Sequence, residues 1–144
     1  MEIATGYFAK ARDYYADGWV LVSIALKDPW FVPDDIPMSA HKELAPTQEI
    51  LNLKDNPSEY ARKYEEDVLS KLDWCELYNK LSTLADSAKR SKVALLCYEA
   101  PGKFCHRHIV ADWLSKKTGT QIKEINLINK PSKNDLFDSD SFSF

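Results

Sequence analysis

Glycine and cysteine are both scarce in this chain of 144 residues, and each scarcity argues against a class of protein. Of the four glycines, only Gly102 lies near the end of an apolar strand, so neither a glycine-rich dinucleotide loop nor a Walker loop is present. The three cysteines form an odd set, which predicts reduced thiols rather than a disulfide framework. No run approaches the roughly 20 apolar residues that span a membrane.

The start of the chain and its charge narrow the function classes further. The first residues lack the basic start and apolar core of a secretory signal, so we expect a cytoplasmic protein without membrane contact. A net charge of -3 disfavours binding to duplex nucleic acid, because proteins that bind duplexes are usually strongly basic. The length predicts a single domain, which we place at residues 1–130. Its α/β class follows from the alternation of strands and helices described next. Residues 131–144 form an acidic tail of Ser, Asp and Phe without periodicity, for which we expect disorder.

Predicted strands and helices alternate along the domain. The predicted strands are Glu2–Phe8, Trp19–Leu26, Val93–Tyr98 and Gln121–Leu127. The predicted helices run from Ala45 to Leu53, from caps at Asn56 and Asp73, and from Cys105 to a stop at Gly119. Between them, Asp28–Pro37 holds three prolines and is predicted to be a loop that Trp30 and Phe31 pin down. The alternation predicts a Rossmann-like, three-layer α/β fold with a mostly parallel sheet of about four strands.

The segment Val93–Leu114, VALLCYEAPGKFCHRHIVADWL, is the most informative part of the sequence. It joins an apolar strand through a Pro-Gly loop to an amphipathic helix. Ligands of parallel sheets bind at the carboxyl ends of strands, and the first turn of a helix offers unpaired N–H groups to an anion. We therefore predict a site for a phosphate-like anion at this junction. The predicted ligand-binding residues are Arg107, Cys97 and Lys103.

Three further side chains at the junction are candidates for catalysis. Cys105 lies at the helix start beside a cation, which lowers a thiol pKa, so it can be a nucleophile, a ligand contact, a metal ligand or a structural thiol. Glu99 shares a strand face with Cys97, and it can act as a general base, hold a ribose hydroxyl or pair with Arg107 or Lys103. His106 is a better candidate than His108, because the two point to different helix faces.

Spacing argues against two familiar chemistries at the junction. In cysteine phosphatases five residues lie between the cysteine and the arginine. Here nine residues lie between Cys97 and Arg107, and one lies between Cys105 and Arg107. A zinc site would draw on the junction's cysteines and histidines, yet adjacent residues rarely bind one metal and no CxxC pair is present. The sequence therefore predicts no metal ligands, and it identifies no cofactor.

The string LCYEAPGKFCHRH resembles the signature of a protein family, domain of unknown function 488. That signature combines a Cys-x-Glu strand end with a Cys-His-Arg helix start, carried here by Cys97, Glu99, Cys105, His106 and Arg107. The segments IATGYFAKA, LVSIALKDPWF and LAPTQEIL extend the likeness to the family's short form over Glu2–Leu127. The resemblance implies a compact α/β domain with a shared site, and it implies no particular reaction.

Three functional hypotheses follow. The first is an enzyme, a hydrolase or transferase, or a binding protein for a nucleotide or phosphorylated metabolite at the junction. The second is a non-enzymatic interaction or regulatory protein whose tail, Asp138–Phe144, binds a protein partner. The third makes Cys97 and Cys105 a redox or metal-binding pair.

Overall fold

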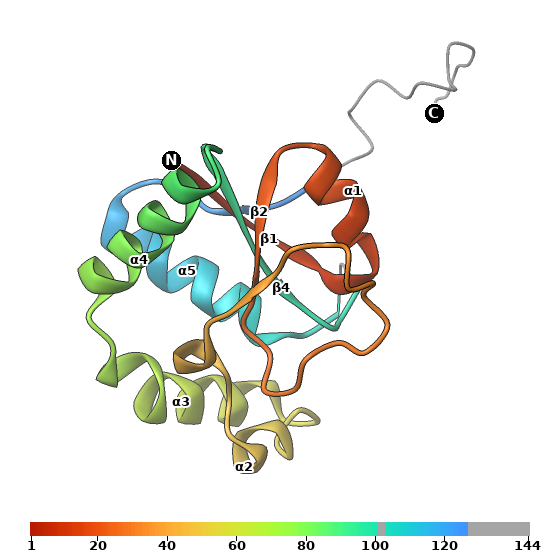
Figure 1. The fold of residues 1–144 in the computed structure, drawn as a ribbon. Coiled ribbons are helices and arrows are strands. Elements are labelled where there is room, and N and C mark those ends of the chain that lie inside the picture. Colours follow the sequence, from red (N-terminus) through yellow and green to blue (C-terminus); the bar gives the residue numbers. More distant parts are fainter. Residues whose placement is uncertain (101–102, 127–144) are drawn as a thin grey trace, which may run out of the picture.

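The computed structural model describes residues 1–100 and 103–126, and these residues form one all-parallel sheet with helices on its faces (Figure 1). The predicted tail, and Leu127 at the end of the last predicted strand, lie outside the described residues. The strands are β1 (Glu2–Tyr7), β2 (Trp19–Ser23), β3 (Ser39–Ala40), β4 (Lys92–Cys97) and β5 (Lys123–Glu124). The α-helices are α1 (Ala11–Ala16), α2 (Gln48–Leu51), α3 (Pro57–Asp67), α4 (Trp74–Ser87) and α5 (His106–Thr118). The 3₁₀ turns are η1 (Phe8–Lys10), η2 (Lys42–Leu44) and η3 (Leu69–Lys71).

The strand order is β3-β2-β4-β1-β5, with all pairs parallel. The predicted α/β class is confirmed, with five strands where we expected about four. The two-residue strand β3 and the short helix α1 were not predicted, because neither is long enough to show a clear period. Since β4 lies between β2 and β1, the order differs from that of dinucleotide-binding folds, and a Rossmann-like topology is not confirmed.

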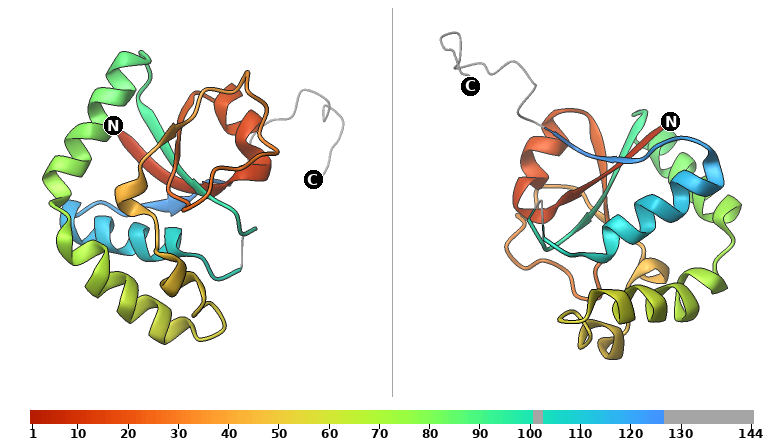
Figure 2. Two further views of the ribbon diagram at one scale, coloured as in Figure 1. Left: turned by 60° about the horizontal axis from the view of Figure 1, so that its bottom comes forward. Right: turned by 180° about the vertical axis from the view of Figure 1, so that it is seen from behind.

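Two apolar clusters cover the two faces of the sheet, and alternation along the strands produces them. On β4, Val93, Leu95 and Cys97 belong to one cluster, while Ala94 and Leu96 belong to the other. Helices α3, α4 and α5 pack on the first face, and α1 packs on the second. Figures 1 and 2 show α1 on the opposite side of the sheet from α4 and α5. The helix start that follows β4 therefore lies on the face covered by three helices.

The helix boundaries follow the predicted caps. The side chain of Asn56 accepts a hydrogen bond from the Glu59 N–H, and that of Asp73 accepts from the N–H groups of Cys75 and Glu76. Gly119 ends α5 with a φ of 75°, a left-handed conformation that favours glycine. Local hydrogen bonding thus places α3, α4 and α5 where the sequence indicates.

The predicted loop at residues 28–37 contains neither helix nor strand. The Phe31 ring makes edge contacts with Phe8 and Tyr98, so Phe31 holds the loop as expected. Trp30 is 90% exposed, and the expectation that it also pins the loop is wrong. Within residues 1–100 and 103–126, no helix combines the length and apolar character that crossing a bilayer requires.

One glycine of the sheet is required by close packing. A Cβ atom on Gly6 would lie 2.6 Å from Cε2 of Tyr14, whose side chain is 1% exposed and has no room to withdraw. We expect Gly6→Ala to lower the free energy of unfolding by about 1–3 kcal/mol through overpacking. Urea denaturation measures this loss. Gly119→Ala is the comparison, because it meets no atom within 4 Å and strains only the backbone. Unchanged stability of Gly6→Ala would contradict the packing described here.

Candidate functional site

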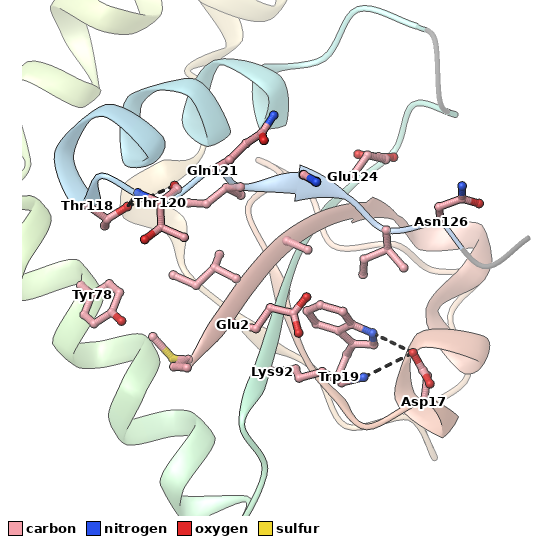
Figure 3. Close-up of a pocket in the computed structure, with 16 residues that line it drawn as sticks. Glu2, Asp17, Trp19, Tyr78, Lys92, Thr118, Thr120, Gln121, Glu124 and Asn126 are labelled. Carbon is pink, nitrogen blue, oxygen red and sulfur yellow. Dashed lines mark hydrogen bonds and ion pairs between the residues drawn. The ribbon is translucent and has the colours of Figure 1, made fainter. Parts of the chain in front are cut away.

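A cavity of about 530 Å³ lies around the amino ends of β1, β2 and β4 and beside β5 (Figure 3). Three of its polar side chains form one group, in which the Asp17 carboxylate accepts a hydrogen bond from Trp19 Nε1 at 3.1 Å and pairs with Lys92 Nζ at 3.4 Å. None of the six residues predicted for the site lines this cavity. Volume alone therefore does not make it the candidate site.

A second cavity, of about 390 Å³, opens at the carboxyl ends of β2 and β4. It lies between the segment after β2, the start of α5 and the short helix α2, which is where parallel sheets bind ligands. Its volume is in the range of small-molecule sites. The residues that matter for its chemistry are Lys27, Lys54, Tyr60, Cys97, Glu99, Phe104, Cys105 and His106.

The structure brings four of the six predicted residues to this second cavity. Cys97 and Glu99 reach it from the end of β4, and Cys105 and His106 reach it from the start of α5. Lys103 is exposed and does not line the cavity, and Arg107 is buried behind it. Within the described residues, Glu99 makes no hydrogen bond or ion pair, so its carboxylate is free for a ligand.

Cys105 is the N-cap residue of α5, with an extended backbone and no capping hydrogen bond from its side chain. The first N–H groups of an α-helix have no carbonyl partner within the helix. In α5 the side chain of the cap residue does not accept a hydrogen bond from them. The first turn also contains no acidic residue. The helix start therefore keeps its positive end beside the cavity.

Arg107 has zero side-chain exposure, and its partner is Glu124 of β5. The Arg107 Nε and Nη2 atoms each donate to one carboxylate oxygen of Glu124 at 3.0 Å, and Nη1 donates to Cys97 Sγ at 3.1 Å. The hydroxyl of Thr5, on β1, donates to the same carboxylate at 2.6 Å. The predicted pairing of Glu99 with Arg107 or Lys103 is therefore wrong, and direct contact of Arg107 with a ligand stays a prediction.

His106 is held in one tautomer by its surroundings. Its Nε2 atom lies 2.6 Å from the carbonyl oxygen of Ile24, and a carbonyl can only accept, so Nε2 carries the proton. The Nδ1 atom is then an acceptor, and it lies 3.8 Å from Cys105 Sγ. Burial lowers the pKa of His106 to about 4, so the ring is neutral at pH 7.

The structure joins Cys97 and Cys105 by a disulfide bond. The prediction of three reduced thiols is therefore wrong for this pair, because the fold brings the strand end and the helix cap together although they are eight positions apart in sequence. Cys75, on α4, is exposed and is the free cysteine of the described residues. Cys97, Cys105 and His106 form a cluster, and the atoms that could bind a metal all lie within 4.8 Å of one another.

Sequence reasoning missed the residues that complete the site. Glu124 lies two positions after Ile122 in a strand-like segment, so both side chains are expected on the same apolar face. A carboxylate on an apolar face needs a buried cation, and this was the signal for its pairing with Arg107. Lys27 and Lys54 lie in irregular segments, and no periodicity marks them. Tyr60 lies on α3, and its contact with Phe104, with ring centroids 4.9 Å apart, depends on the tertiary fold.

The buried ion pair predicts a large stability effect at Glu124. We expect Glu124→Gln to lower the free energy of unfolding by on the order of 3 kcal/mol, because it leaves the Arg107 charge buried without its counterion. Glu66→Gln is the matched control, since Glu66 and Arg62 form a pair with side chains 58% and 51% exposed. Its loss should be under about 1 kcal/mol. Equal losses in urea denaturation would contradict the structural role of Arg107.

A comparison with known families matches residues 26–118 to DUF488-N3a, described as the active DUF488-N3 subclade. No curated protein and no solved structure matches the chain. The matched segment covers more than half of the sequence, and it contains the strand end, the loop and all of α5. It also contains Cys97, Glu99, Cys105, His106 and Arg107. The chain therefore belongs to the DUF488 family.

Proposed function

We propose that the second cavity binds a small anionic metabolite of the nucleotide or phosphorylated-sugar class, and that the chain is a hydrolase or transferase acting on it. The observation that carries this proposal is that Cys97, Glu99, Cys105 and His106 line one cavity at the carboxyl end of the sheet. They come from two different elements. The description of the matched subclade as active supports catalysis over binding alone.

Positive charge at the cavity supports an anionic ligand. Lys27 and Lys54 both line it, and within the described residues neither side chain makes an ion pair. The amino end of α5, where the Cys105 side chain caps no N–H group, adds the positive end of the helix dipole. In this proposal the two lysines and the helix start hold the anion, while Arg107 acts as a positioning residue through its contact with Cys97.

The remaining lining matches the other parts of a nucleotide. The rings of Tyr60 and Phe104 offer an apolar aromatic wall for a base. The free carboxylate of Glu99 can accept a hydrogen bond from a ribose hydroxyl, or take a proton from an attacking group. Cys105 and His106 line the same cavity as Glu99, and in this proposal the reacting bond is placed among them.

Thermal shifts test this proposal directly. A ligand present at about ten times its Kd should stabilise the chain by about 1.4 kcal/mol, which raises Tm by several degrees. We expect such a shift with a nucleotide or phosphosugar, and a several-fold weaker affinity in Lys54→Ala and Glu99→Gln because each removes one ligand contact. Titration of each compound against Tm measures both.

Lys71→Ala is the control for loss of one positive charge, because Lys71 is exposed on η3 and does not line the cavity. It should keep the full shift. The absence of a shift with every nucleotide, phosphosugar and inorganic phosphate would contradict the proposal, and so would equal shifts in wild type, Lys54→Ala and Glu99→Gln.

A further inference from the structure

The strongest unassigned feature of the described residues is the cluster of Cys97, Cys105 and His106. The three side chains are 1%, 7% and 4% exposed, and their ligand atoms all lie within 4.8 Å of one another. All three also line the second cavity. Two thiolates and an imidazole in one buried place are the donor set that zinc prefers.

The orientation of His106 is that of a metal ligand. Histidines that bind metals almost always donate their other ring N–H to a carboxylate, a backbone carbonyl or water. His106 already makes this outer contact, because Nε2 donates to Ile24 O at 2.6 Å. The lone pair of Nδ1 is left on the side of Cys105 Sγ, 3.8 Å away.

The spacing of the two cysteines fits a shared metal ion. Their Cα atoms are 7.5 Å apart, whereas disulfides usually span about 4.4–6.8 Å. Two thiolates on one tetrahedral zinc ion have sulfurs about 3.8 Å apart, because each Zn–S bond is about 2.3 Å long. The wider Cα spacing suits that arrangement.

Charge balance also favours a divalent cation at this place. Two thiolates and a neutral imidazole carry two negative charges, which a Zn²⁺ ion cancels, so the buried cluster has no net charge when loaded. Arg107 Nη1 donates to Cys97 Sγ at 3.1 Å and stabilises the thiolate form, and Glu124 balances the charge of Arg107 itself.

We propose that the reduced chain binds one Zn²⁺ ion through Cys97 Sγ, Cys105 Sγ and His106 Nδ1, with the fourth coordination position open to the second cavity. The inference rests on the proposed function, which it deepens: three protein ligands and one open position are the arrangement of catalytic zinc sites. Glu99, free beside the cluster, takes the proton of the group bound at the open position. Cys105 is then a metal ligand rather than a nucleophile.

In the folded chain the adjacent residues Cys105 and His106 can bind the same metal ion. Adjacent residues rarely share a metal because their side chains diverge along a regular element. Cys105 is extended, with φ -158° and ψ 148°, whereas His106 is the first residue of the helix. The change of backbone conformation between them lets both side chains reach one point, as their 3.8 Å contact demonstrates.

Metal binding requires reduction of the disulfide. Two molecules of a small thiol reductant transfer two electrons and two protons, which gives two cysteine thiols and one molecule of oxidised reductant. Zinc binding then displaces the two thiol protons to solvent while two Zn–S bonds and one Zn–N bond form. The oxidised chain has no thiolate to offer, so the disulfide and the metal exclude each other.

Cobalt(II) titration of the untagged, reduced and chelator-treated full chain tests the site. We expect one cobalt ion per chain, an intense thiolate-to-cobalt charge-transfer band with tetrahedral d–d bands, and loss of both spectra on adding zinc. Cys97→Ser and Cys105→Ser should bind at least 100-fold more weakly, and His106→Gln at least tenfold more weakly. Cys75→Ser is the matched control and should bind as wild type does, because Cys75 is a free, exposed cysteine elsewhere. The oxidised chain should not bind.

X-ray absorption of the zinc-loaded wild type is the second measurement, and it does not depend on any variant folding. The expected shell holds two sulfurs at about 2.3 Å and one nitrogen at about 2.0 Å. A shell of nitrogen and oxygen alone, a missing charge-transfer band, or unchanged binding by a folded Cys97→Ser would overturn the metal site. If the chelator-treated chain still shows the Lys54-dependent thermal shift, the proposed function survives that failure. If the chain binds zinc as expected but no nucleotide, phosphosugar or phosphate shifts its Tm, the result would contradict the proposed function and leave the metal site standing.

Discussion

The ion pair between Arg107 and Glu124 is the interaction on which the site depends. One buried guanidinium links the start of α5 to β5 through a bidentate contact and to β4 through Cys97 Sγ, while Thr5 of β1 holds the same carboxylate. Taking both charges out of water costs free energy that only such complete pairing offsets. The helix start is consequently fixed against the sheet, and this fixes the positions of the Cys105 and His106 side chains.

Local patterns in the sequence were sufficient where the controlling interaction is itself local. The caps at Asn56 and Asp73 depend on N–H groups two or three residues away, so the starts of α3 and α4 could be predicted. Cys97 and Glu99 line the same cavity as predicted, although β4 ends at Cys97 and the two-residue period of a strand does not extend to Glu99. The strand order could not be predicted, because the insertion of β4 between β2 and β1 is decided by pairing between segments about 70–90 residues apart.

The partner of Arg107 marks the limit of reasoning from a motif. Adjacency in sequence suggested that Cys105, His106 and Arg107 face one ligand, yet successive residues of a helix point about 100° apart, so His106 and Arg107 of α5 cannot share a direction. His106 faces the cavity and Arg107 faces β5. Lys27 and Lys54 were missed for the opposite reason: they reach the cavity from irregular segments, where side-chain direction follows no period.

The two cavities differ in the residues that line them, and Cys97, Cys105 and His106 line only the smaller one. In the larger cavity Asp17 contacts Lys92 and Trp19, while Glu2 and Lys123 form no ion pair among residues 1–100 and 103–126. In the smaller cavity Lys27, Lys54 and Glu99 likewise have no ion-pair partner among residues 1–100 and 103–126. Arg107 does not line the smaller cavity, and it contacts the site through the hydrogen bond from its Nη1 atom to Cys97 Sγ. In this chain the Cys-His-Arg helix start therefore combines the N-cap residue Cys105, an imidazole oriented by the Ile24 carbonyl and a buried arginine that contacts Glu124 and Cys97 Sγ.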